Sequence, residues 1–423
     1  MKMDLPAPVA RALSELERSG HQGYVVGGCV RDSLMGRTPG DYDITTSALP
    51  EQVQACFSGE RVVPTGIKHG TVTVILDGMP LEITTFRADG EYSDHRRPDS
   101  VSFSTRLEDD LCRRDFTINA MAYSPQRGLI DLYGGVADIS AGVVRCVGDA
   151  VRRFDEDALR MLRAVRFAAS LEFDIDPATL MALNERLGDI AYVARERVFT
   201  ELNKALNARS PVRALATGQG LVLCALGIEA SELDVANLEW LKPARARMQE
   251  GYALALELVK RVKCEGGLRW AALLAPLGAE RAEHVLRGLR APNDIIERAC
   301  AAISGAARPF GVERAEVLRM LNALGVDGLN DALALARAAA DCGGDAARCE
   351  MLDAAAAQAR RAVDAGACYT LRQLAIGGRE LSALGLKGRA VGAMLEQLLN
   401  EVMAGDLPNE AAALVARAKE AVK

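Results

Sequence analysis

The stretch YVVGGCVRDSLMGRTPGDYDITT, residues 24–46, constrains the fold more strongly than any other part of this chain. Its first apolar residues predict a short buried strand, which passes through Gly27 and Gly28 into CVRDSLMG, a short helix ended by Gly36. The segment YDITT favours a second strand directly afterwards. A strand, a glycine turn, a helix and another strand in so short a stretch indicate an α/β unit.

Two aspartates, Asp41 and Asp43, lie in the second of these strands. Residues i and i+2 of a strand point to the same face about 6.6–6.8 Å apart, so we expect the two carboxylates side by side. Oxygen ligands at this spacing suit one or two Mg²⁺ ions, which can activate a hydroxyl and stabilise a pyrophosphate leaving group. Glu82, in LEITTFR on a neighbouring predicted strand, is a candidate third carboxylate. A bare D-x-D pattern is also typical of two solvated acids on an edge strand.

The glycine pair and Arg31 favour the functional interpretation of these aspartates. Glycines lack side chains, so a phosphate can approach the backbone closely, and the start of a helix attracts anions. Arg31, on the first helical turn, adds a guanidinium that can bind phosphate with two hydrogen bonds. A tight turn followed by an Arg–Asp surface pair would explain the glycines alone. The combination with D-x-D on the next strand is much more specific than either feature.

The rest of residues 1–141 continues the mixed pattern. A helix is expected at about residues 5–19, and TVTVILDG, LEITTF and GLIDLYGG predict strands. RRDFTINAMAY is expected to open a helix, and RADGEYSDHRRPDSV to form a mobile loop. After Gly142 helical patterns dominate, beginning with VRRFDEDALRMLRAVRFAASL, which predicts one strong helix. The predicted fold is therefore an α/β head with a mixed sheet, followed by an elongated all-α extension.

Composition limits the partners and the compartment of the chain. The net charge of −6 gives no support for a nucleic-acid partner, which would need a local basic surface. The 10 cysteines are scattered without a C-x-x-C pair, which is typical of reduced thiols in the cytoplasm. No apolar run approaches the roughly 18 residues of a membrane span, and the N-terminus has no signal-peptide core. We therefore expect a cytoplasmic protein with no membrane partner.

The segment GGCVRDSLMGRTPGDYDITT resembles the nucleotidyltransferase signature of the polymerase-beta-like superfamily. More narrowly, it is similar to class II tRNA nucleotidyltransferases, or CCA-adding enzymes, and to their relatives, the bacterial poly(A) polymerases. The stretches GTVTV with LEITTFR, RRDFTINAMAY and DEDALRMLRAVRFA match the same family, and RERVFTELNKAL fits the helix that follows. The C-terminal segment CYTLRQLAIGGRELSALGLKGRAVGAMLEQLL resembles the end of CCA-adding enzymes of the Gram-positive type.

The resemblance implies four parts: a nucleotidyltransferase head (1–141), a neck with a nucleotide-selecting helix (142–209), a helical body (210–360) and a tRNA-binding tail (361–423). It implies that the 3′-hydroxyl at the acceptor end of tRNA attacks the α-phosphate of CTP, twice, and then that of ATP. By the same resemblance, Asp41 and Asp43 hold Mg²⁺, and the residues around the triphosphate are Gly28, Arg31 and Arg114.

The segment DEDALRMLRAVRF places Asp157, Arg160, Arg163 and Arg166 at steps of three along the predicted helix. Each step turns about 300°, so Asp157 and Arg160 are neighbours and Arg163 continues their face. Arg166 is expected on the far side, so that no single ligand atom contacts all four residues. Ordinary salt bridges along a helix would explain this spacing as well.

A carboxylate beside a guanidinium can also select two of the four bases. Cytosine presents an amino donor beside the acceptor N3, and adenine presents one beside the acceptor N1, whereas uracil and guanine reverse both groups. A mismatched polar edge is costly when buried, so such a pair discriminates well. The family is held to select bases in this way. The resemblance places Asp157 and Arg160 in this role and adds Arg163 and Arg166 to the nucleotide site.

Rival functions remain within the superfamily. Poly(A) polymerases of this class usually carry a basic G-[RK]-[RK]-F stretch, for which Lys68 and His69 are poor substitutes. CC-adding enzymes shorten the loop after the TTFR strand, whereas that loop is full length here. An A-adding enzyme stays open, because the recognition pair alone does not report it. A non-catalytic RNA-binding protein on this scaffold would be signalled by loss of Asp41 or Asp43, and both are present.

Two further segments carry hypotheses about function. GLKGRAVG, residues 385–392, places Lys387 and Arg389 before an apolar helix, as in a cradle for a backbone phosphate, although a capped turn between helices explains it as well. We expect the tail to bind the T-arm side of tRNA. The loop Asp89–Asp99 is expected to reorganise the site between C and A addition. The sequence does not predict the oligomeric state.

Overall fold

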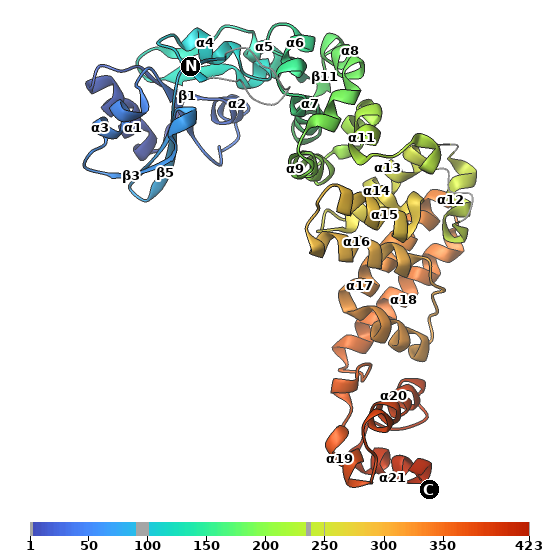
Figure 1. The fold of residues 1–423 in the computed structure, drawn as a ribbon. Helices are drawn as coiled ribbons and strands as arrows, with labels where there is room; N and C mark the ends of the chain where they lie inside the picture. Colours follow the sequence, from blue (N-terminus) through green and yellow to red (C-terminus); the bar gives the residue numbers. More distant parts are fainter. Residues whose placement is uncertain (1–2, 90–100, 234–237, 249, 423) are drawn as a thin grey trace. The chain divides into compact units, whose positions relative to one another are not determined.

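The computed structural model describes residues 3–89, 101–233, 238–248 and 250–422. The chain forms two compact units, Met1–Gly227 and Ile228–Lys423. Figure 1 shows strands in the first unit and helices throughout the second. Most of the loop predicted at Asp89–Asp99 lies outside the described residues. The strands that flank it, β6 (Arg87–Asp89) and β7 (Val101–Phe103), pair antiparallel with each other.

The first unit is built on a mixed sheet, as the sequence predicts. Within the described residues it has seven strands in the order β3-β4-β5-β2-β1-β8-β9. Strand β2 pairs parallel with β5, and the other neighbours are antiparallel. The strands are β1 (Gly23–Val26), β2 (Asp43–Thr46), β3 (Arg61–Gly66), β4 (Thr71–Leu76), β5 (Met79–Thr85), β8 (Met121–Ser124) and β9 (Gly128–Asp131).

Alternation along the strands divides the side chains between two hydrophobic clusters. Val25 of β1 packs in the larger cluster, together with α1 (Ala7–Arg18) and α3 (Pro50–Cys56). Its neighbours Tyr24 and Val26 belong to a second cluster, which includes Leu111 of α4 (Leu107–Cys112). Strand β1 is therefore covered on both faces, which fixes the position at which the chain leaves it for the glycine turn and α2 (Gly28–Leu34).

The helix predicted for RRDFTINAMAY is wrong. Only Thr117–Asn119 forms a single 3-10 turn, and the chain then continues as strand β8. Tyr123 and Ala122 pair with Val25 and Val26 of β1. A helix here would leave one edge of β1 without its ladder of hydrogen bonds, so the tertiary context overrides the local pattern.

Helices follow the sheet in the first unit, together with a short parallel pair formed by β10 (Val143–Val144) and β11 (Asp174–Ile175). The pattern changes at Gly142, which ends the helix before β10 with a φ of 67°. The helices are α5 (Gly135–Ala141), α6 (Ala150–Glu156), α7 (Leu159–Leu171), α8 (Pro177–Glu185), α9 (Arg195–Leu206), α10 (Pro211–Thr217) and α11 (Gln219–Leu226).

The single helix predicted from Val151 onward is broken in two. Helix α6 ends at Glu156, Asp157 is extended with φ −153° and ψ 101°, and α7 begins at Leu159. The Oδ1 of Asp157 accepts a hydrogen bond of 3.0 Å from the backbone N–H of Leu159. A short polar side chain that binds a nearby backbone donor starts a new helix instead of continuing the old one.

The described part of the second unit is all-α, as predicted. Helix α17 bends at Gly325, which has a φ of 70° inside an otherwise helical run. A hydrogen-bonded ion pair between Arg298 and the buried Asp331 joins α16 to α17. In the part of the chain that is described, none of the helices combines the length and the apolar character needed to cross a bilayer. The helices are α12 (Lys242–Arg247), α13 (Gly251–Arg261), α14 (Leu268–Leu274), α15 (Gly278–Gly288), α16 (Asn293–Ala306), α17 (Arg314–Gly343), α18 (Ala346–Asp364), α19 (Gly378–Ala383), α20 (Arg389–Ala404) and α21 (Ala411–Val422).

Candidate active site

A cavity of about 570 Å³ lies in the first unit, where α2 and β2 of the sheet face α7. It brings together almost all the residues that the sequence analysis selected. The residues from that set that line it are Gly28, Arg31, Asp41, Asp43, Arg114, Asp157, Arg160, Arg163 and Arg166. Glu82 is exposed and lies outside the described lining, although it stands opposite Asp43 in the register of β2 and β5.

The two aspartates form the acidic end of the cavity. Partial desolvation raises the pKa of Asp43 above its ordinary value, and the nearby carboxylates of Asp41 and Glu82 raise it further. Arg114 acts in the opposite direction. Carboxylates that repel one another at the mouth of a cavity fit a divalent cation, which would remove the repulsion. Among the described residues, no group of three or more His, Cys, Asp or Glu side chains has the arrangement of a metal site, so the candidate site has two carboxylates.

Gly27 lets Arg114 approach the backbone closely at the start of α2. Gly27 has φ 76° and ψ −129°, which a residue with a side chain adopts only with strain. A Cβ on Gly27 would lie 3.1 Å from a terminal nitrogen of Arg114. A Cβ on Gly28 would lie 3.6 Å from a terminal nitrogen of Arg31. The predicted glycine turn is thus present, with the guanidinium of Arg114 close to Gly27 and that of Arg31 within ordinary contact distance of Gly28.

Arg114 binds a buried carboxylate and has a further N–H donor that makes no hydrogen bond to the described residues. Its Nη2 donates to Asp110 at 3.0 Å, and Arg113 donates to the other oxygen of the same residue. Asp110 is fully buried; burial alone would raise its pKa, but Arg114 and Arg113 hold it below the ordinary value. The Nε of Arg114 is buried and has no hydrogen-bond partner among the described residues. Arg114 is therefore fixed in place with N–H capacity left for an anion.

A buried hydrogen-bond chain links Arg31 to α7. Arg31 donates to Asn119 at 2.7 Å, and Asn119 donates to Asp115 at 3.2 Å. The other oxygen of Asp115 accepts from Nε of Arg163 at 2.7 Å. Burial would raise the pKa of Asp115, but Arg163 and Asn119 outweigh it and lower the pKa to about 2. These hydrogen bonds connect the glycine turn with α7, and the sequence analysis selected neither Asp115 nor Asn119.

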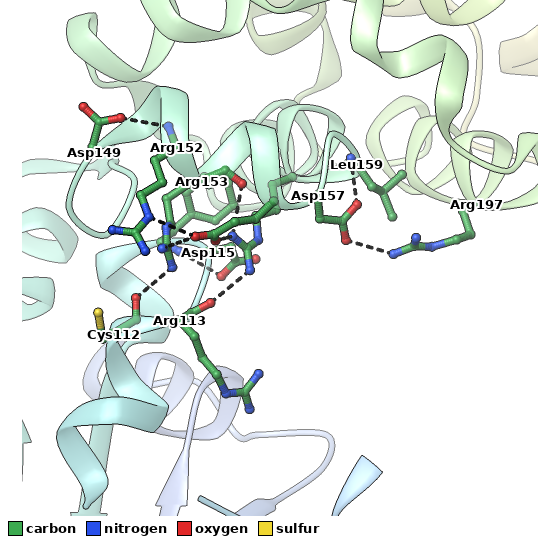
Figure 2. Close-up of polar contacts among 12 residues, drawn as sticks. Cys112, Arg113, Asp115, Asp149, Arg152, Arg153, Asp157, Leu159 and Arg197 are labelled. Atoms are coloured by element: carbon green, nitrogen blue, oxygen red, sulfur yellow. Dashed lines mark hydrogen bonds and ion pairs between the residues drawn. The ribbon is translucent and has the colours of Figure 1, made fainter. Parts of the chain in front are cut away.

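Asp157 and Arg160 have separate side-chain anchors, and the backbone N–H of Arg160 donates to the carbonyl oxygen of Asp157 at 2.9 Å. Figure 2 shows Asp157 between Leu159 and Arg197, and Arg197 donates to it at 3.1 Å. Arg160 donates to Glu156 at 2.6 Å and to the carbonyl oxygens of Arg153 and Arg113, both at 3.0 Å. The pair is not two steps on one helix, because the chain breaks at Asp157. Both side chains nevertheless line the same cavity.

The expectation that Arg166 lies on the far side of the helix is wrong with respect to the cavity. Arg166 lines it together with Arg163, and its Nε lies 2.6 Å from the carboxylate of Glu201 on α9. A long side chain can compensate for a rotation of about 60° between successive positions. Glu201 is 6% exposed, so this ion pair ties α7 to α9 inside the protein.

Comparisons with known proteins identify the family of the chain. Residues 23–145 match the family model "Poly A polymerase head domain", and residues 265–418 match "tRNA nucleotidyltransferase domain 2 putative". The chain is 40% identical over 293 residues to the CCA-adding enzyme of Geobacillus thermodenitrificans, which covers 69% of this chain and 68% of that protein. The chain belongs to the CCA-adding enzyme family. The CCA-adding enzyme of Geobacillus stearothermophilus gives the same identity over 295 residues, 70% of this chain and 69% of the relative.

The family membership extends to the solved structures. The crystal structure of the Bacillus stearothermophilus CCA-adding enzyme in complex with CTP matches with a TM-score of 0.77 and 30% identity, over 99% of this chain and 98% of that one. Residues 172–217 match the model "Probable RNA and SrmB- binding site of polymerase A". The predicted resemblance to CCA-adding enzymes and the predicted fold class are confirmed.

Several residues of this CCA-adding family member were missed in the sequence. Glu156 lies directly before Asp157 in the quoted motif, and its carboxylate binds both Arg153 and Arg160. The signal was present, because a second acid beside Asp157 stands four residues before Arg160. Arg197 lies 40 positions from Asp157, so no local pattern connects the two.

Proposed function

We propose that this chain adds CCA to the 3′ end of tRNA without a template, using CTP and ATP and releasing pyrophosphate. The observation that carries the proposal is one cavity in which the paired aspartates face a wall of arginines that includes Arg31, Arg114 and Arg160. The acidic end suits a cation and the arginine wall suits a polyanion. The names of the relatives, which are CCA-adding enzymes, support the same reaction.

Asp41 and Asp43 would hold Mg²⁺ at the acidic end. The raised pKa of Asp43 supports this role, because a bound cation would favour its charged form. Mg²⁺ bound there would supply activation of the attacking 3′-hydroxyl and stabilisation of the departing pyrophosphate. Glu82 stays a candidate third carboxylate that acts from the neighbouring strand.

The triphosphate would lie against the glycine turn, with Gly28, Arg31 and Arg114 around it. In the reaction a bond forms between the 3′-oxygen of tRNA and the α-phosphorus, while the bond from that phosphorus to pyrophosphate breaks. Negative charge accumulates on the leaving group, and guanidinium groups already fixed by Asp110 and Asn119 can stabilise it without first reorganising. The same anchors keep each arginine from turning toward solvent.

The base would be selected by Asp157 and Arg160, with Arg163 and Arg166 completing the nucleotide site. Asp157 accepts from the amino group of C or A, and Arg160 donates to the adjacent ring nitrogen. Separate anchors at Arg197 and Glu156 favour this role, because they hold the carboxylate and the guanidinium in place along the same cavity. Uracil and guanine would set an acceptor against the carboxylate and a donor against the guanidinium.

The remaining assignments follow from the same family. We place the head at 1–141, the neck at 142–209, the body at 210–360 and the tail at 361–423, and we propose that the protein is cytoplasmic. Lys387 and Arg389, both exposed at the start of α20, would contact the T-arm side of tRNA.

A primer-extension assay tests the function. Purified protein with Mg²⁺ receives tRNA that ends at the discriminator base, at CC or at CCA, with CTP, ATP or both. Growth from the discriminator base to CCA followed by a stop is the expected result. A halt at CC in the presence of ATP would indicate a CC-adding enzyme, and extension only from CC an A-adding enzyme. Long A tails would indicate a poly(A) polymerase, and no incorporation at all a non-catalytic RNA-binding protein.

A further inference from the structure

The aromatic ring of Phe167 lies where three arginines of the cavity meet. Phe167 belongs to α7, lines the cavity and is 7% exposed. The guanidinium carbons of Arg166, Arg31 and Arg163 lie 4.0, 5.3 and 5.5 Å from the centre of its ring. Arg31 comes from α2 and the other two come from α7, so one ring contacts cations from both sides of the cavity.

An aromatic face attracts these cations by its electrostatic character as well as by contact. The face of the ring is negative, and a guanidinium within about 6 Å of its centre is stabilised, more strongly where water is excluded. Like charges that converge repel each other. Burial lowers the pKa of Arg166 most, and Arg163 and Arg31 lower it further, against the carboxylates of Glu201 and Asp115, which raise it. The attraction to the ring therefore offsets part of the repulsion among the three arginines.

Each of these arginines also has polar partners elsewhere in the protein, and Arg31 has a second one, Asp32, at 2.9 Å. Arg31 binds Asn119, Arg163 binds Asp115 and Arg166 pairs with Glu201. A guanidinium has five N–H donors, so one or two anchors do not exhaust it. The ring contacts all three guanidinium groups; Arg31 and Arg163 are also held by hydrogen bonds, and Arg166 by an ion pair, which restricts their positions.

The ring itself is held from behind. Phe116 is fully buried and packs against Phe167 with the ring centres 5.7 Å apart and an angle of 80° between the planes. Such an edge-to-face contact favours a defined ring orientation. Phe116 follows Asp115 directly in the sequence, so the segment that anchors Arg163 also fixes the ring beneath it.

We propose that Phe167 is a positioning residue that holds Arg31, Arg163 and Arg166 in the orientation that binds a nucleoside triphosphate. This inference rests on the proposed nucleotide-binding function of the cavity and deepens it. The family motifs that drew attention to the arginines give no role to this ring. Its effect is on the affinity for the nucleotide, exerted through the arginines.

The test replaces Phe167 with mono-, di- and trifluorinated phenylalanines in the full chain. Fluorine withdraws density from the ring face while changing the side-chain volume little. We expect the Kd for CTP and for ATP to rise stepwise along the series, to about tenfold for the trifluorinated ring, since loss of the cation–π contacts is on this scale. The same series at Phe57, which is 3% exposed in the head core, is the matched control and should give no trend.

Two further variants separate positioning from packing. Phe167→Tyr keeps an aromatic face and should bind CTP within about twofold of the wild type, whereas Phe167→Leu should resemble the trifluorinated protein. Thermal unfolding of every variant checks that the fold is intact. A flat series at Phe167, with CTP bound normally by the wild type, would overturn this inference and leave the proposed function standing. Wild-type protein that binds neither CTP nor ATP would contradict both.

Discussion

Two aspartates of the same cavity, Asp43 and Asp115, have pKa values shifted in opposite directions. Desolvation and two neighbouring carboxylates raise the pKa of Asp43. Asp115 is more deeply buried, yet Arg163 and Asn119 lower its pKa to about 2. The carboxylate that would take part in chemistry carries repulsion that Arg114 offsets only in part, whereas the carboxylate that binds the arginine wall has its hydrogen bonds satisfied by protein groups. Each end of the cavity thus lacks what its ligand would bring: a cation at one end and an anion at the other.

The largest effect should come from the acidic end. Replacing Asp43 with Asn removes a charge that would hold Mg²⁺, so we expect incorporation of CMP to fall by about 10²–10³-fold, the scale of losing a preorganised electrostatic group. Single-turnover extension of tRNA that ends at the discriminator base measures it. Glu82→Gln, on the neighbouring strand but outside the cavity lining, tests the candidate third carboxylate in the same assay and should lose much less. An equal loss for both would make Glu82 a full member of the site.

The next effect should be on stability at the arginine end. A lowered pKa means that ionised Asp115 stabilises the fold above its unfolded pKa of about 4, and that this contribution disappears as the pH falls from about 4 to 2. Asp115→Asn should cost about 2 kcal/mol at pH 7, below the range for fully buried pairs because the Arg163 side chain is 34% exposed. Urea unfolding at several pH values measures the difference, which should narrow below about pH 4.

Two cations outside the cavity should have a smaller effect, on the affinity for tRNA. Lys387 and Arg389 are exposed at the start of α20 and would act only through long-range attraction and contacts to phosphates. The double variant Lys387→Ala with Arg389→Ala should bind tRNA several-fold more weakly and reduce the salt slope of binding by about one to two. Binding measured from low to high salt tests this. Unchanged affinity and an unchanged salt slope would mean that Lys387 and Arg389 do not contact tRNA.

The smallest effect should come from Asp43→Asn, which should stabilise the fold, whereas Asp115→Asn should destabilise it. A raised pKa means that the carboxyl favours folding below its unfolded pKa, and that this benefit is lost as the pH rises through the folded pKa. Asp43→Asn should therefore raise Tm at pH 7 without Mg²⁺, by about 1–2 °C, because solvent screens the exposed carboxylate. The gain should vanish near pH 3. A lower Tm at pH 7 would mean that Asp43 is not under repulsion.

The acidic end could be predicted because its geometry is local. The D-x-D spacing predicted that Asp41 and Asp43 lie together, and both line the cavity, although the expectation of one strand is wrong because β2 begins only at Asp43. Glycines before a helix predicted the turn beside Arg31 and Arg114. These inferences need only a few neighbouring residues. They hold because β2 is a central strand, whose register is fixed by pairing on both sides.

The arginine end was only partly predictable because tertiary contacts determine it. Arg197 reaches Asp157 from α9, and Asn119 reaches Arg31 from a segment that was expected to be helical. The break at Asp157 depends on one side-chain hydrogen bond to the N–H of Leu159, which competes with a strong helical pattern. The list of arginines was therefore correct as a lining of the cavity, but their arrangement was not.

The two ends of the cavity are expected to have different roles: the acidic end determines the rate of incorporation, and the arginine end determines which base is selected. One comparison of variants tests this most directly. Equilibrium binding and single-turnover incorporation of CTP, ATP, UTP and GTP would be measured for the wild type, Asp43→Asn and Arg160→Lys. We predict that Asp43→Asn keeps the preference of binding for C and A while losing the rate. Arg160→Lys, which cannot reproduce the contacts to Glu156 and to two carbonyls, should retain turnover but lose about 5–100-fold of the discrimination against UTP and GTP. Loss of rate and of discrimination together in both variants would contradict the division of labour.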